Sequence, residues 1–238
     1  MAKGIKIWTT DIKNCYVWTT PVKEVYAWTT KVRPSGWQPW ANTYMYWELV
    51  SNANDTSWHN RNGTVNGTVT WNSWAVFAWS WQISSPINSM PSDFTISCWV
   101  NKTQNSTSEQ VLFAKWWSSN EYQRFWMFYD GSWNLKVRQG TSSSGWNWLS
   151  VWNYWYNTWH NVIFTKTGTN IKVYVDWVEK NSFSYSSRSE YSSTYLGIWW
   201  WTSSQRNFSG TIKDFIVENK TRTAQEATDY YNLTKWNY

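Results

Sequence analysis

The chain has 238 residues and a formal net charge of +6, with 15% of its residues charged. This length suits one all-β domain with an extension, or two small domains. Lys and Arg are scattered and no apolar run approaches the roughly 20 residues of a membrane-spanning helix, so we expect neither a nucleic-acid nor a membrane partner. The N-terminal MAKGIKI lacks the apolar segment of a secretory leader, so no signal peptide is expected.

Three copies of Trp-Thr-Thr, ten residues apart, begin at Trp8, Trp18 and Trp28. Short apolar segments flank each copy, which predicts a short strand, a turn and a second short strand. Ten residues cannot bury a core alone, so such units must stack on one another or on a partner. We expect residues 1–36 to be a β-repeat docking arm and residues 37–43 to be a linker.

Residues 44–238 are expected to form an all-β domain. Alternating apolar and polar runs are separated by Gly, Asn, Asp and Ser clusters at nearly even spacing, which is typical of a sandwich or jelly roll. A short helix is expected within residues 221–234, where Thr223 and Glu226 have the spacing of a capping box. Strands are expected at residues 43–49, 64–70, 94–101, 110–114, 124–129, 134–138, 159–166, 170–176, 193–198 and 210–218.

Tryptophan is in excess and glycine in deficit, with 26 Trp against 10 Gly. Glycine is thus about 4% of the chain against an average of about 7%, although a turn-rich β-protein should exceed that average. Several Trp stand where a turn favours Gly. Trp177 follows Asp176 between two strand-like runs, in the place of Gly in an Asp-Gly turn. Trp58, Trp133 and the run at 199–201 also lie among loop residues.

We interpret this pattern as a gene that uses UGA for glycine, translated here with tryptophan at those codons. The alternative is a genuine aromatic platform for carbohydrate, because flat indole faces stack on sugar rings. A platform needs period-2 spacing along a strand, which the run at 199–201 does not have. Trp47, Trp99 and Trp159 stand in strand-like contexts, and we expect them to be genuine packing residues.

Five segments resemble, in family order, motifs of a LamG-like, concanavalin A-type jelly roll. The resemblance covers about 190 residues and implies a two-sheet sandwich, as the even spacing of strands does. Trp58, Trp79 and Trp81 fall on glycines of the family pattern. The segments are YWELVSNANDTSWHNRNGTVNGTVTW (46–71), AVFAWSWQISSP (75–86), FTISCWVN (94–101), TWHNVIFTKTGTNIKVYVDWVEKN (158–181) and FSGTIKDFIVENKTRTAQEATDYYN (208–232).

The resemblance also implies a calcium site that joins the opening loop to the last strand. Asp55 matches the acidic residue of the loop, and Asp214 lies near the closing acidic pair, although Lys213 replaces its first member. Oxygen-rich loops suit Ca²⁺. The alternative is that Asp55 orders its loop as an Asx-turn residue.

The sequence gives no sign of catalysis. Glycosidases need two carboxylates about 5–5.5 Å apart in the retaining class, which a strand supplies with Glu-x-Asp-x-Glu spacing. That run is absent, and His59 and His160 have no Ser or Cys partner by spacing. We therefore expect no enzyme activity, with a glycosidase of this fold as the alternative.

The Gly-Thr-Thr form of the N-terminal repeat resembles N-terminal segments of phage virion proteins. This resemblance implies a phage tail or other virion-surface protein that binds host glycan or a cell-surface receptor. Residues 1–36 would then dock to other virion proteins, and a homo-oligomer is expected. The alternative is a bacterial cell-surface adhesin. The expected location is the virion or an extracellular surface.

Overall fold

The computed structural model describes most of the residues from 42 onward and short parts of the N-terminal arm. The described residues are 16–17, 20–21, 25–27, 30–32, 42–77, 82–87, 90–103, 109–116, 125–132, 134–140, 146–153, 156–184, 195–198 and 208–238.

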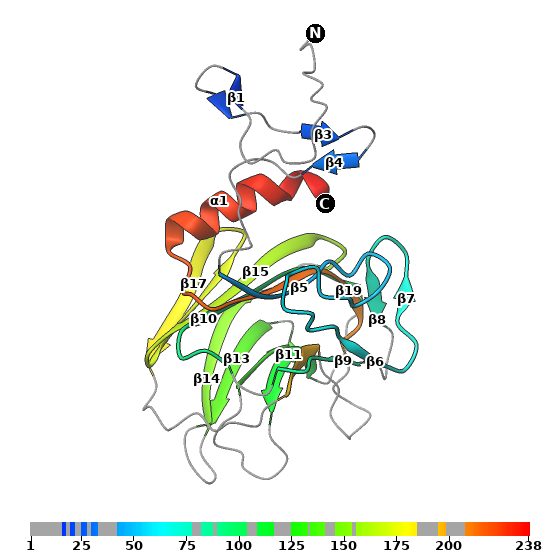
Figure 1. Cartoon of the computed structure of the whole chain (residues 1–238). Helices are drawn as coiled ribbons and strands as arrows, with labels where there is room; N and C mark the ends of the chain where they lie inside the picture. The colour runs from blue at the N-terminus through cyan, green and yellow to red at the C-terminus, as the bar shows by residue number, and fades with distance from the viewer. Residues whose placement is uncertain are drawn as a thin grey trace.

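Two antiparallel sheets pack face to face in the described part of residues 42–238 (Figure 1). This arrangement confirms the expected all-β sandwich. The eight-stranded sheet has the order β17 (Val178–Ser184), β16 (Asn170–Val175), β15 (Trp159–Thr167), β10 (Phe94–Lys102), β19 (Gly210–Glu218), β8 (Ala75–Phe77) and β7 (Thr70–Trp71), and β5 (Thr43–Trp47) also pairs with β19. The seven-stranded sheet has the order β14 (Trp146–Asn153), β13 (Asn134–Gly140), β12 (Phe125–Tyr129), β11 (Gln110–Trp116), β18 (Tyr195–Ile198), β9 (Gln82–Ser84) and β6 (Thr64–Asn66).

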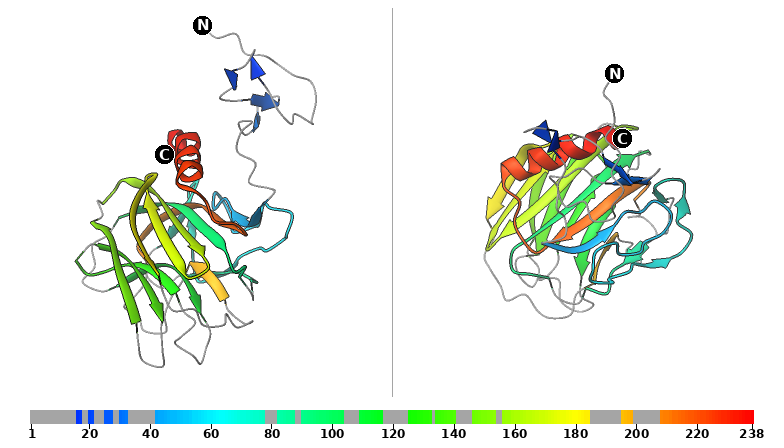
Figure 2. Two further views of the ribbon diagram at one scale, coloured as in Figure 1. Left: turned by 90° about the vertical axis from the view of Figure 1, so that its left-hand side faces the viewer. Right: turned by 45° about the horizontal axis from the view of Figure 1, so that its top comes forward.

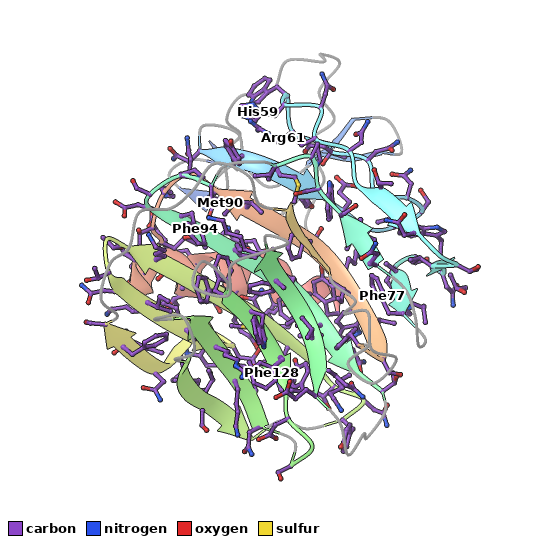
Figure 3. The ribbon with its side chains drawn as sticks, turned by 90° about the horizontal axis from the view of Figure 1, so that it is seen from below. His59, Arg61, Phe77, Met90, Phe94 and Phe128 are labelled. Atoms are coloured by element: carbon purple, nitrogen blue, oxygen red, sulfur yellow. The ribbon has the colours of Figure 1, made fainter. Side chains whose placement is uncertain are left out.

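The core between the sheets is rich in phenylalanine. Phe125 stacks on Phe164 with ring centroids 5.1 Å apart, and Phe94 stacks on Phe125 at 5.5 Å. Figure 3 shows Phe94 among the side chains of this layer. Cys98 is a fully buried free thiol of the same layer, and burial raises its pKa, so it packs as a small apolar residue.

Helix α1 (Ala224–Thr234) lies across the other face of the eight-stranded sheet (Figures 1 and 2) and is followed by the 3₁₀ turn η3 (Lys235–Asn237). The capping box is confirmed: the Thr223 hydroxyl accepts from the Glu226 N–H, and the Glu226 carboxylate accepts from the Thr223 N–H. Ala227 and Tyr230 pack on Tyr46 and other residues of the sheet. Among the described residues, no helix is long and apolar enough to cross a membrane.

The prediction of one strand at residues 64–70 is wrong, because this segment divides into β6 and β7, which lie in different sheets. Gly67 has φ of 95°, which breaks the extended run between them. The sequence analysis also did not identify β8, β9 or β14.

Two hairpins appear in the N-terminal arm. Strand β1 (Tyr16–Val17) pairs with β2 (Thr20–Pro21), and β3 (Val25–Ala27) pairs with β4 (Thr30–Val32). Each pair is a two-stranded sheet outside the two layers of the sandwich (Figure 1). The first repeat lies outside the described residues, and the boundaries at residues 36 and 43 stay predictions.

We expect Gly63→Ala to lower stability by about 1–3 kcal/mol, because a Cβ there overpacks the core. It would lie 2.5 Å from a methyl carbon of Ile83 and 3.0 Å from the Trp47 ring. Urea unfolding measures the effect, with Asn66→Ala on exposed β6 as control. Equal stability of the two variants would contradict the tight packing around Gly63.

Candidate functional site

The loop between β5 and β6 is built around the buried carboxylate of Asp55. Its Oδ1 accepts from the N–H groups of Tyr46 and Ser57, each at 2.9 Å. Its Oδ2 accepts from the Ser57 hydroxyl and the Arg61 N–H, each at 2.8 Å. The Asp55 N–H in turn donates to the side chain of Asn62. These bonds fold residues 48–63 into a defined loop on the end of β5.

The folded loop brings two of its polar side chains to Tyr44 of β5, and we call these three residues the opening-loop cluster: Tyr44, His59 and Arg61. The Arg61 guanidinium lies 3.7 Å from the centre of the Tyr44 ring, and the His59 ring lies 5.9 Å from it. Trp58 is 72% exposed and His59 is also exposed. Figure 3 shows His59 and Arg61 next to each other at one edge of the molecule.

This cluster combines groups that recognise polar ligands. Arginine offers several N–H donors in a fixed geometry, and histidine can donate or accept. The Arg61 guanidinium covers one face of the half-buried Tyr44 ring, and its Nη1 donates to the Tyr44 carbonyl, which holds the guanidinium in place. Such a surface can bind hydroxyl-rich or anionic ligands without chemistry on them.

Strand β19 is irregular at Asp214, the second residue expected at the calcium site. Its register with β10 shifts between Ser97 and Trp99, and Asp214 has φ of 51°. The bulge places the carboxylate between two tyrosine hydroxyls. Its Oδ1 accepts from the Tyr46 hydroxyl at 2.5 Å, and its Oδ2 accepts from the Tyr238 hydroxyl. Burial raises the pKa of Tyr238 and the charge of Asp214 raises it further, so this phenol stays a donor.

The two aspartates contact opposite ends of one residue. Asp55 accepts from the main chain of Tyr46, and Asp214 accepts from its hydroxyl. The described residues hold no group of three or more His, Cys, Asp or Glu side chains suited to a metal ion. Ca²⁺ takes six to eight oxygen ligands, and all of the roughly four acceptor positions of the Asp55 carboxylate are used. With all of its acceptor positions used, Asp55 does not fit a calcium ligand. The hydrogen bonds of Asp55 favour a role in ordering the loop, and the calcium site stays a prediction.

A row of aromatic rings crosses the helix-covered face of the eight-stranded sheet. Neighbouring rings contact one another, and Trp99, in the middle, is 2% exposed. Rings whose faces are already covered by neighbours have little face left to stack on a sugar. The row therefore fastens α1 and the C-terminal residues to the sheet. In order it contains Trp177, Tyr231, Trp99, Tyr238, Trp159 and Trp74, with centroids 4.2–5.6 Å apart.

A second apolar cluster lies outside the main core on the seven-stranded sheet. It contains Val111, Ala114, Trp126 and Phe128, none more than 6% exposed. Arg138 lies over the Trp126 ring at 4.9 Å. Because these side chains are buried, the cluster is packing rather than an open ligand surface.

The sequence analysis missed a His–Asp pair next to the β16–β17 turn. His160 Nδ1 lies 2.5 Å from Asp176 Oδ2, and the Asn161 N–H donates to Asp176 Oδ1 at 2.9 Å. The hairpin register, in which Val162 faces Val175, brings these residues together. The pair ties the turn to the start of β15.

A buried lysine lies at the end of β10. Lys102 is 2% exposed, and its Nζ lies 4.6 Å from the centre of the Tyr156 ring and 5.6 Å from that of Tyr129. Burial lowers its pKa to about 8. The charged amine is therefore less favourable in the folded protein than in water.

The fold and sequence define the class of this protein. A family model described as the concanavalin A-like lectin/glucanases superfamily, of the laminin G type, matches residues 77–228. The chain belongs to this superfamily, which confirms the LamG-like resemblance. A comparison with curated proteins gave no significant match.

Solved structures share this fold at low sequence identity. Domain 4 of AbnA, a GH43 extracellular arabinanase from Geobacillus stearothermophilus, in complex with arabinotriose, has a TM-score of 0.64 and 19% identity over 79% of this chain and 97% of that domain. The binding domain of botulinum neurotoxin DC, in complex with rat synaptotagmin II, has a TM-score of 0.65 and 15% identity. A botulinum neurotoxin type C structure, described by its dependence on two ganglioside molecules for cell entry, has a TM-score of 0.62 and 16% identity. Each neurotoxin match covers 80% of this chain, which spans 51% of the neurotoxin chain.

We expect Asp55→Asn to lower stability by about 2–3 kcal/mol, because a buried acceptor of main-chain N–H groups loses its charge and half of its acceptor capacity. Urea unfolding measures the loss, with the exposed neighbour Asn54→Ala as control. If Asp55 holds calcium, EDTA should lower the Tm of the parent and added Ca²⁺ should restore it. If neither EDTA nor Ca²⁺ changes the Tm of the parent, and Asp55→Asn is destabilised, the result supports the loop-ordering role alone.

The low pKa of Lys102 predicts a pH effect on stability. The amine titrates near pH 8 when folded and near its ordinary 10.5 when unfolded, so between these values the unfolded chain binds more protons. Stability therefore rises with pH in this window. We expect the parent to gain about 2 kcal/mol relative to Lys102→Met between pH 8 and pH 10, measured by urea unfolding. A constant difference would show that Lys102 titrates normally.

Proposed function

We propose that this chain is a non-enzymatic recognition protein of a phage tail or other virion surface, which binds host carbohydrate or a cell-surface receptor. The observation that carries this proposal is the opening-loop cluster. It brings the half-buried Arg61 guanidinium and the exposed His59 ring of an ordered loop next to the Tyr44 ring of β5.

Proteins that share the fold support binding rather than chemistry. The arabinanase domain was solved with a trisaccharide, and the neurotoxin structures concern a protein receptor and gangliosides. This chain also lacks the Glu-x-Asp-x-Glu spacing that paired glycosidase carboxylates need on one strand.

The N-terminal hairpins support docking into a larger assembly. A two-stranded hairpin is marginally stable alone in water, so β1–β2 and β3–β4 need a surface to stack on. Attachment of many copies to one particle, including as a homo-oligomer, would multiply weak glycan contacts into firm attachment.

We also propose that the gene reads UGA as glycine. The 26 Trp and 10 Gly of the chain support this, as do the Trp at glycine positions of the family pattern. Such a code occurs in some bacterial lineages and their phages, which agrees with a virion protein.

We expect the chain to bind members of an array of bacterial surface polysaccharides, and His59→Ala to weaken that binding about 5-fold through loss of one hydrogen bond. Leu233→Ala, on the exposed face of α1, is the control and should bind as the parent does. Reducing-end assays on the same panel test the absence of hydrolysis. Release of sugar would make the protein a glycosidase, and equal binding by His59→Ala would move the site away from the opening loop.

A further inference from the structure

The turn between β16 and β17 has a backbone made for glycine. Val175 pairs with Val178, so the connection is the two-residue turn Asp176-Trp177. Asp176 has φ of 48° and Trp177 has φ of 66°. Positive φ at both central positions defines a type I′ turn, for which Asp-Gly is among the preferred pairs. A bulky side chain with φ in this region is a conformational outlier.

In the N-terminal arm, two further pairs of strands are separated by the same number of residues. Val17 pairs with Thr20, and Ala27 pairs with Thr30. Two residues connect each pair, Trp-Thr in both cases, with tryptophan at positions 18 and 28. Two-residue hairpins use type I′ or II′ turns, and the type II′ turn takes glycine at its first central position. Gly-Thr has glycine at that position, so the spacing of the paired strands and the sequence favour glycine at positions 18 and 28.

Other tryptophans occupy places that only a large ring fills. Trp47 and Trp99 lie within strands and are 0% and 2% exposed. The Trp47 indole N–H donates to the Arg61 carbonyl at 2.9 Å, and its ring stacks on Phe215. The Trp99 indole N–H donates to the Thr234 hydroxyl at 3.1 Å, and its ring stacks on Tyr238 at 4.2 Å. Glycine at either place would leave a cavity, and the acceptor of the indole N–H would lose that donor.

From these two groups we infer that positions 18, 28 and 177 are glycine in the protein made by its native cell, and that positions 47 and 99 are tryptophan. This inference rests on the proposed UGA code and adds which residues it changes. The φ angles of the Asp176-Trp177 turn decide the assignment of position 177, and the spacing of the paired strands carries positions 18 and 28. At 47 and 99, a buried strand position with a bonded indole N–H requires tryptophan.

The assignment also decides which surface faces a ligand. Trp177 is 43% exposed and contacts the Tyr231 ring at 4.4 Å, at one end of the aromatic row. With glycine at 177 the row ends at Tyr231, and the exposed indole at that turn disappears. The native surface there is less aromatic, so this turn is not a place for sugar stacking.

The test is tandem mass spectrometry of the protein purified from its native source, with two proteases so that all five positions are read. The inference predicts glycine at 18, 28 and 177 with tryptophan at 47 and 99. Tryptophan at all five would overturn both the inference and the proposed code. Glycine at 47 or 99 would keep the proposed code and overturn the assignment of residues from the structure. A mixture of tryptophan and glycine among positions 18, 28 and 177 would do the same.

Melting of variants of the tryptophan-containing chain gives an independent check. Trp177→Gly should melt at or above the parent, because relief of the φ of Trp177 offsets its one ring contact. Trp99→Gly, its matched control, should melt roughly 10 °C lower through lost packing. A similar fall in Tm in both variants would contradict the assignment of glycine to position 177 and tryptophan to position 99.

Discussion

The whole eight-stranded sheet depends on strand β19. It pairs with β10 on one side and with both β5 and β8 on the other, so it joins segments that are far apart in the sequence. The first strand of the sandwich, β5, has its ladder only with this last strand among the described residues. The pairing of β5 with β19 therefore closes a loop that spans most of the sandwich, at an entropic cost.

The bulge at Asp214 connects β19 to residues on the helix-covered face of the sheet. It lets one carboxylate hold the hydroxyls of Tyr46, from the first strand, and of Tyr238, beyond the helix. Trp99 then stacks on Tyr238, so strand, bulge and C-terminal residues form one packed unit. Neither the bulge nor these contacts leaves a local signal in the sequence, because they join residues that are 24 or more positions apart.

Local patterns predicted the fold well and the site only in part. The period-2 runs in β10 and β15, and the capping box at Thr223, were visible because their physics is local. Gly67 could have signalled the break between β6 and β7, since glycine interrupts a strand easily. Asp55 was identified as important, but three of its four donors are main-chain N–H groups, which the sequence does not distinguish. The His160–Asp176 pair needed the hairpin register, which only the structure supplies.

The pairing of β5 with β19 has a mechanical meaning. The chain enters the sandwich at β5, so a pull on the residues before it would act along the length of that strand. The antiparallel ladder, in which Met45 faces Val217 and Trp47 faces Phe215, would then be loaded in shear. In that geometry the hydrogen bonds share the force together rather than opening one after another. The ladder between β5 and β19 is thus the contact that would resist such a pull.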